Sequence, residues 1–132
     1  MSERAMAIVV GHGSIASGMI SAVEKITGHG AHLHPISNDG LSGAELATAL
    51  RQAMDETGAR IVFTDLPAGS CNIAALRVIH DTPGAVIVMG ANLPALLFFA
   101  MHPELPPEEA AVESAKRGGA ALKIYPDAAR AG

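Results

Sequence analysis

The chain has 132 residues and a formal net charge of −4; hydrophobic residues make up 49% of it, while aromatic residues make up only 3%. This length fits one domain over residues 1–132, with a core built from Ala, Val, Ile, Leu and Met side chains. The sequence has no run of Lys or Arg, which argues against a nucleic-acid-binding protein because such proteins need a basic stripe.

The sequence also indicates a compartment. Its one cysteine, Cys71, cannot form a disulfide within the chain, so an oxidising compartment is not implied. The N-terminus does not resemble a secretory signal. The most apolar stretch, residues 85–101, is interrupted by Gly90, Asn92 and Pro94, so it does not predict a membrane span. We expect a cytoplasmic protein that is not inserted in the membrane.

The first half of the chain alternates between short apolar runs and segments of helical periodicity. The clearest boundaries belong to its second helix, where Ser42 and Glu45 have the spacing of a capping box and Gly58 is a stop signal. The predicted elements of this half are a strand over residues 5–10, a helix over 14–28, a strand over 32–36 and a helix over 42–57.

The second half continues the alternation. Pro94 and the pair Pro106–Pro107 have the positions expected at helix starts. The predicted elements are a strand over residues 59–65, a helix after Cys71, a strand over 85–89, helices over 94–101 and 106–119, and a last short strand over 120–125.

This alternation predicts an α/β fold: a doubly wound, mostly parallel four-stranded sheet with helices on both faces. The last segment, residues 120–125, predicts an extra antiparallel strand at the edge of that sheet. In such a fold the carboxyl ends of the strands meet at one edge, where ligands bind.

Polar residues follow three of the predicted strands: His12, Asp65 and Asn92. An acid beside a neutral imidazole accepts one ring N–H and fixes the tautomer, which leaves the other nitrogen as a nucleophile or base. The flanking Gly11 and Gly13 leave the imidazole uncrowded and let another molecule approach closely, and Gly13 is also expected to bind phosphate. The sequence therefore predicts His12 as the reactive residue and Asp65 as its partner, with Asn92 either bracing the site or capping the next helix.

A second group of residues surrounds the start of the helix after Asp65. Gly69 and Ser70 offer backbone N–H groups and a hydroxyl, which suit an anionic ligand. Asn72 is expected to hold the same loop. Together these residues predict a histidine that accepts a phosphoryl group, with an anion-binding site beside it and no metal.

Three alternatives remain open on the residues alone. Gly11, Gly13 and Ala16 fit the dinucleotide-binding fingerprint, although a histidine between the glycines fits poorly. Ser70, His12 and Asp65 are the residue types of a hydrolase triad, but the nucleophile elbow is missing. Otherwise His12 is a solvated loop residue and Asp65 caps a helix.

Three segments resemble the IIA component of the mannose class of the bacterial phosphotransferase system (PTS), and most closely its galactosamine and N-acetylgalactosamine subgroup. Spacing and element order agree along nearly the whole chain. The segments are Gly11–Met19, Phe63–Ala75 and Val86–Pro94.

The resemblance implies a cytoplasmic phosphoryl carrier that needs no metal or organic cofactor. His12 would take a phosphoryl group from phospho-HPr and give it to a IIB component during sugar uptake. Asp65 would orient His12, and Ser70 would hydrogen-bond the phosphate. The family also implies a homodimer in which a strand such as residues 120–125 pairs with the other subunit.

The chain departs from the family at its phosphate loop, which often has Gly-Gly-Ser/Thr-Pro where this chain has Ala68, Gly69, Ser70 and Cys71. We interpret Cys71 as a small neutral filler. Two alternative functions stay open beside the carrier: a regulatory relative that signals its phosphorylation state, and a small-ligand or nucleotide-binding module without phosphoryl transfer.

The histidine cluster His29, His32 and His34 offers a second candidate metal site, with His32 and His34 predicted on one face of a strand. No acid or cysteine completes the ligand set. We interpret these histidines as surface residues.

Overall fold

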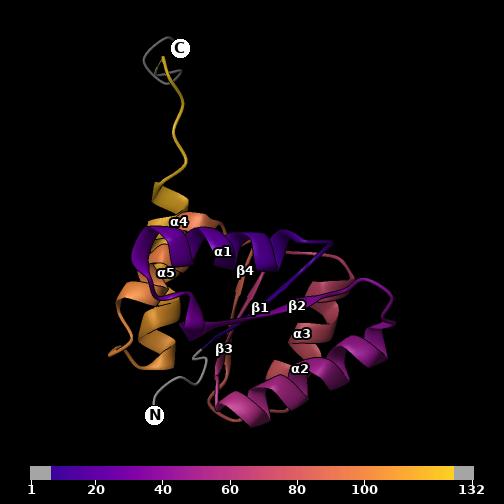
Figure 1. The fold of residues 1–132 in the computed structure, drawn as a ribbon. Helices are drawn as coiled ribbons and strands as arrows, with labels where there is room; N and C mark the ends of the chain where they lie inside the picture. The colour runs from indigo at the N-terminus through magenta and orange to yellow at the C-terminus, as the bar shows by residue number, and fades with distance from the viewer. Residues whose placement is uncertain (1–6, 127–132) are drawn as a thin grey trace.

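The computed structural model describes residues 7–126, so the first two residues of the predicted strand over 5–10 lie outside it. Its centre is a four-stranded parallel sheet in the order β2-β1-β3-β4 (Figure 1). The strands are β1 (Ala7–Gly11), β2 (Leu33–Ser37), β3 (Ile61–Thr64) and β4 (Val86–Met89).

Five α-helices connect and follow these strands within the described residues. The capping box of α2 is present: Ser42 Oγ accepts from the Glu45 N–H at 3.1 Å, and Glu45 Oε1 accepts from the Ser42 N–H at 2.8 Å. Gly58 ends the same helix with φ of 79°. The helices are α1 (Ile15–Thr27), α2 (Gly43–Thr57), α3 (Ser70–His80), α4 (Leu93–Met101) and α5 (Pro107–Ala120), with a 3₁₀ turn η1 (Gly30–His32).

Helices cover both faces of the sheet, as the predicted doubly wound α/β fold requires (Figure 1). Side chains alternate along each strand. Ile8 and Val10 of β1 pack in the core under α2 and α3, while Ala7 and Val9 pack in the core under α1, α4 and α5. No helix within residues 7–126 is long and apolar enough to cross a membrane.

The predicted strand over residues 120–125 is absent from the chain. Helix α5 continues through the Gly118–Gly119 pair to Ala120, and residues 121–126 form no strand. Gly118 packs closely on the start of α4, where a Cβ would lie 2.7 Å from Asn92 Oδ1. In the single chain the segment has no strand beside it, and Figure 1 shows it running away from the sheet.

The histidine cluster also differs from the prediction. His32 belongs to η1, not to β2, so it does not share a strand face with His34. Its ring instead stacks on that of His29, with ring centroids 5.6 Å apart. These three histidines belong to no group of potential metal ligands in the described part of the chain.

The winding of the chain determines where loops meet. From β1 the chain passes outward to β2, and from β3 it passes outward to β4 in the opposite direction. Helices α1 and α3, which follow β1 and β3, therefore cover opposite faces. Doubly wound folds bind ligands at such a reversal, which lies here between the carboxyl ends of β1 and β3.

Candidate active site

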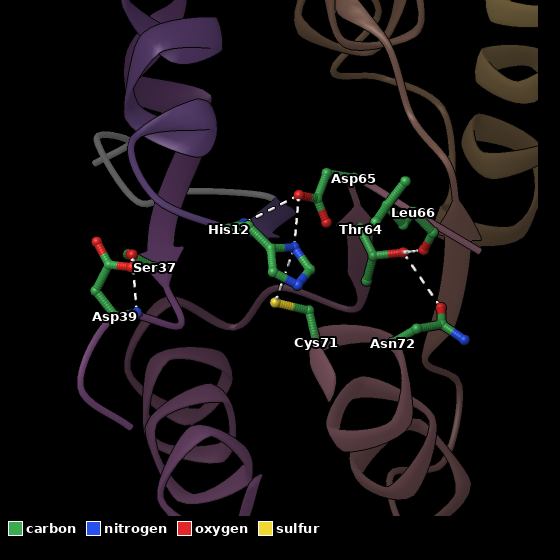
Figure 2. A network of polar contacts seen from close by, with 8 residues as sticks. All are labelled: His12, Ser37, Asp39, Thr64, Asp65, Leu66, Cys71 and Asn72. Atoms are coloured by element: carbon green, nitrogen blue, oxygen red, sulfur yellow. Dashed lines mark hydrogen bonds and ion pairs between the residues drawn. The ribbon is translucent and has the colours of Figure 1, made fainter. Parts of the chain in front are cut away.

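His12 lies at this reversal, directly after β1. Its ring Nδ1 lies 2.9 Å from Asp65 Oδ2, and its main-chain N–H donates to the same oxygen at 2.9 Å (Figure 2). Asp65 directly follows β3, the neighbour of β1 in the sheet. The strand order thus brings together two residues that are 53 positions apart in the sequence.

Asp65 determines which ring nitrogen of His12 carries the proton. Burial works to raise the pKa of the Asp65 carboxyl, but the hydrogen bonds and charge of His12 hold that pKa below its ordinary value. The ionised carboxylate can only accept hydrogen bonds. A neutral His12 ring therefore carries its proton on Nδ1, and its lone pair is on Nε2.

The Nε2 side of His12 faces the N-terminus of helix α3. A Cβ built on Gly69, the N-cap of α3, would lie 3.9 Å from Cε1 and 4.0 Å from Nε2 of His12. Gly69 has φ of 98°, which favours glycine. The first N–H groups of a helix have no partner within it. A group attached to Nε2 would thus lie near the positive end of the helix dipole.

Ser70 and Gly13 flank this region. Ser70 is exposed and is the first residue of α3. Its main-chain N–H therefore has no partner within the helix, and its hydroxyl lies beside it in the first turn. Gly13 follows His12 with φ of 57°, and a Cβ there would meet nothing within 4 Å. The site therefore offers hydrogen-bond donors and open space, as an anionic group needs.

Asn72 holds the loop between β3 and α3. The buried Asn72 side chain donates to the Pro67 carbonyl at 3.2 Å, and its Oδ1 lies 3.3 Å from the Thr64 hydroxyl (Figure 2). The same hydroxyl lies 3.0 Å from the Leu66 carbonyl. These contacts hold the loop that carries Asp65. The sequence placed Asn72 at this loop.

Asn92 lies elsewhere, and the structure decides between its two predicted positions. Its Oδ1 accepts from the Ala95 N–H at 3.1 Å, which caps α4, and its side-chain amide donates to the Gly118 carbonyl of α5 at 2.9 Å. Both partners lie outside the loops of His12 and Asp65. Asn92 therefore joins α4 to α5 and does not brace the site.

Sequence reasoning missed the particular requirement at Gly11. A Cβ on Gly11 would lie 2.5 Å from Ile15 Cγ2 and 3.4 Å from Asp65 Oδ2. A side chain there would crowd both the start of α1 and the carboxylate that His12 contacts. The glycine before His12 was visible in the sequence, but its closeness to Asp65 depends on the strand order.

Cys71 also contacts the site. Its Sγ lies 3.8 Å from His12 Nδ1, and its side chain is buried in the first turn of α3 (Figure 2). Burial and the negative charge of Asp65 raise the pKa of the Cys71 thiol. The free thiol is therefore neutral at neutral pH, which agrees with its interpretation as a filler.

Comparisons with known proteins identify the group to which the chain is related. The sequence model of the EIIA-man family, described as the PTS system fructose IIA component, matches residues 6–116. The chain belongs to this family. A comparison with curated proteins found no match.

Solved structures of PTS proteins share the EIIA-man fold of this chain. The PTS component EIIA from Streptococcus agalactiae has a TM-score of 0.79 and 21% identity over 90% of this chain and 95% of its own. The mannose/sorbose specific IIA subunit from Enterococcus faecalis has a TM-score of 0.78 and 19% identity, over 92% of this chain and 94% of its own. The PTS IIA protein associated with the fucose utilization operon from Streptococcus pneumoniae has a TM-score of 0.68 and 25% identity, over 86% of this chain and 89% of its own.

Membership of the EIIA-man family confirms the predicted resemblance to mannose-class PTS IIA proteins, which are phosphotransferases as a group. It favours phosphoryl-group chemistry over the dinucleotide-binding and hydrolase alternatives. The narrower resemblance to the galactosamine subgroup stays a prediction.

Proposed function

We propose that this chain is a phosphoryl carrier, in which His12 Nε2 accepts a phosphoryl group from phospho-HPr and passes it to a IIB component during sugar uptake. The observation that carries the proposal is the contact of 2.9 Å between His12 Nδ1 and Asp65 Oδ2, which leaves Nε2 free opposite the start of α3. Family membership supports the PTS context, and the resemblance supplies the two partners.

The transfer moves a phosphoryl group between two nitrogens. The Nε2 lone pair of His12 attacks phosphorus, the N–P bond of the donor phosphohistidine breaks, and its electron pair returns to the donor imidazole. His12 keeps its Nδ1 proton, so its ring gains positive charge as the new N–P bond forms. Asp65 Oδ2, which accepts from that N–H, stabilises this charge where it develops.

The phosphoryl group itself needs stabilisation by donors. The free N–H groups at the start of α3, together with the Ser70 hydroxyl, are the groups we assign to this role. Each charge-assisted hydrogen bond contributes about 1.5–3 kcal/mol, and the helix N-terminus adds about 0.3–1 kcal/mol. Positioning and charge supply most of what phosphoryl transfer requires. The proposed carrier works in the cytoplasm without a metal or organic cofactor.

We also propose that the carrier is a homodimer. Strand β4 has a neighbour on one side only, and its Met89 is 45% exposed. Leu122, Ile124 and Tyr125 are 86%, 69% and 95% exposed. The exposed segment of one copy could add as a strand to the unpaired β4 edge of the other, and this pairing would cover both the edge and the segment.

The carrier role is tested by mixing the protein with phosphoenolpyruvate, enzyme I and HPr and measuring its intact mass. We expect the wild-type protein to gain one acid-labile phosphoryl group, which a mannose-class IIB protein then removes. His12→Ala should gain none. His80→Ala is the matched control, because the His80 side chain is 88% exposed and lies at the C-terminal end of α3, opposite the end that faces His12; it should be phosphorylated normally.

Three results would contradict the proposal. Phosphorylation of the His12→Ala variant would show that another residue is the acceptor. No phosphorylation of the wild-type protein, with active phospho-HPr confirmed, would favour the small-ligand alternative. Phosphorylation without transfer to IIB would favour the regulatory alternative.

A further inference from the structure

Three potential metal ligands of different chemical types meet at His12. One ligand atom each from His12, Asp65 and Cys71 lies within 4.8 Å of the other two. His12 Nδ1 lies 2.9 Å from Asp65 Oδ2 and 3.8 Å from Cys71 Sγ (Figure 2). They come from the loop after β1, the loop after β3 and the first turn of α3, and they form the only such group in residues 7–126.

The donor set has a chemical preference. An imidazole nitrogen, a thiolate sulfur and a carboxylate oxygen suit Zn²⁺ and similar cations, whereas Mg²⁺ and Ca²⁺ prefer oxygen ligands alone. In a tetrahedral zinc site with bonds of about 2.0–2.3 Å, ligand atoms are roughly 3.3–3.8 Å apart. The separation of 3.8 Å between His12 Nδ1 and Cys71 Sγ lies within that range. The separation of 2.9 Å between His12 Nδ1 and Asp65 Oδ2 is a hydrogen-bond distance, so these two atoms would move apart by roughly 0.4 Å to hold the ion.

Asp65 provides an independent observation. Its side chain is only 7% exposed, and Oδ1 is buried without a hydrogen-bond partner among the described residues. A buried carboxylate oxygen with no partner is costly. A cation held by this carboxylate would offset the cost. The His12 side chain is 41% exposed, which gives an ion a path from solvent and leaves its fourth coordination position for water.

We propose that His12, Asp65 and Cys71 form a binding site for Zn²⁺ or a similar divalent cation, and that the bound ion blocks phosphorylation of His12. The binding site rests on the ligand geometry and on the unpartnered Asp65 oxygen, while the block rests on the proposed carrier function. Cys71 is also a position at which the chain departs from the family loop, so the site is a property of this chain.

The block follows from the tautomer. To bind the ion through Nδ1, the neutral His12 ring must carry its proton on Nε2, and the Cys71 thiol releases its proton to solvent. One proton is therefore released per ion, and Asp65 binds as the carboxylate that it already is. Nε2 then carries the proton, so it has no free lone pair with which to attack phosphorus. Metal binding and phosphoryl acceptance are thus mutually exclusive in the unphosphorylated protein.

The binding site is tested with Co²⁺, which replaces Zn²⁺ and has a visible spectrum. Titration of the full chain with CoCl₂ should give the intense bands of tetrahedral Co²⁺ and a thiolate-to-cobalt charge-transfer band, and Zn²⁺ should abolish both. Cys71→Ser and Cys71→Ala should lose the charge-transfer band and bind Co²⁺ at least about tenfold more weakly. Circular dichroism checks that both variants fold.

The matched control is His32→Ala, which removes an imidazole of the stacked pair outside the site and should leave the cobalt spectrum unchanged. A wild-type spectrum without the charge-transfer band would overturn the site, as would a band that persists in both Cys71 variants. Loss of the spectrum in His32→Ala would place the ion at the histidine cluster instead.

The block is tested separately, by phosphorylation from phospho-HPr with and without Zn²⁺. Zn²⁺ should abolish phosphorylation of the wild-type protein, EDTA should restore it, and Cys71→Ala should resist Zn²⁺ at least about tenfold better. HPr is phosphorylated beforehand and freed of Zn²⁺, so that any inhibition by Zn²⁺ arises from its binding to this chain. Equal phosphorylation of the Zn²⁺-loaded and metal-free proteins would overturn the block. If no protein is phosphorylated without Zn²⁺, the carrier function fails, while the cobalt spectrum still decides the site.

Discussion

The carboxylate of Asp65 decides which nitrogen of His12 is free to react. It accepts hydrogen bonds from both the ring and the main chain of His12, so it fixes the tautomer and the position of the ring together. Asp65→Asn keeps the shape of the side chain but removes its charge. We expect the rate of phosphoryl acceptance to fall by about 10²-fold or more, measured by rapid-quench kinetics.

Asp81→Asn is the control for this substitution. Asp81 is also ion-paired, with Arg51 at 3.2 Å, but its side chain is 55% exposed and it is the C-cap of α3, at the opposite end of that helix from His12. Its removal should leave the rate unchanged. An Asp65→Asn variant as fast as Asp81→Asn would show that the carboxylate has no part in the transfer.

The same pair predicts how stability depends on pH. Because the pKa of Asp65 is lower in the folded protein than in the unfolded chain, the unfolded state binds more protons between the two values. The stabilisation from Asp65 is therefore complete above the unfolded pKa of about 3.9 and is lost as the pH falls through the folded pKa. In urea unfolding from pH 7 to pH 2, the stability difference between the wild type and Asp65→Asn should shrink on the acid side. A difference that stays constant would contradict this.

Among the described glycines, Gly11 is the one at which an added Cβ would come closest to another atom. In Gly11→Ala the new Cβ would lie 2.5 Å from Ile15 Cγ2, so we expect a loss of about 1–3 kcal/mol in the free energy of unfolding. Gly18→Ala in α1 is the control, since a Cβ there meets nothing within 4 Å and alanine favours the helix by about 1 kcal/mol. Equal stabilities of the two variants in urea unfolding would contradict the crowding at Gly11.

At the scale of elements, local signals determine where helices begin and end. The reciprocal hydrogen bonds of Ser42 and Glu45 begin α2. Ser42→Ala should lower the free energy of unfolding by about 1 kcal/mol, because an N-cap hydroxyl is lost. Ser17→Ala, at an exposed position of α1, should change it by less than about 0.5 kcal/mol. Phosphorylation should be unaffected in both, and a Ser42→Ala protein as stable as the wild type would contradict the cap.

These local signals explain how much of the fold the sequence predicts. Ser42, Glu45 and Gly58 act through neighbours within four residues, so the boundaries of α2 follow from the sequence. The strand over residues 120–125 fails for the opposite reason. Whether an apolar segment becomes a strand depends on a partner strand, and in the single chain residues 121–126 lie beside no strand of the sheet.

The site is predictable in part. The strand ends indicate His12 and Asp65, and the start of the following helix indicates Gly69 and Ser70. The position of Asn92 cannot be predicted, because its partner carbonyl belongs to Gly118, 26 residues away on another helix. Likewise, no local pattern shows that the Cys71 thiol faces His12, 59 residues earlier in the chain.

At the scale of the whole molecule, the order β2-β1-β3-β4 creates the site. It makes β1 and β3 neighbours and sends their helices to opposite faces, so their loops meet without covering each other. The same order leaves β4 at an edge, next to the surface where we propose that a second copy docks.

The proposed homodimer is tested by light scattering after size exclusion. The wild-type protein should have twice the mass of one chain, and Ile124→Lys should have the mass of one chain because a charge enters the proposed interface. Ile26→Lys, at an equally exposed apolar position of α1, should remain dimeric. A monomeric wild-type protein would contradict the dimer.

The central claim is that His12 Nε2 carries the phosphoryl group while Nδ1 keeps its proton for Asp65. Long-range proton–nitrogen and phosphorus NMR of the phosphorylated, ¹⁵N-labelled protein tests it directly. We predict phosphorus coupling to Nε2 of His12 and a protonated Nδ1. A phosphoryl group on Nδ1 of His12, or on any other residue, would contradict the account.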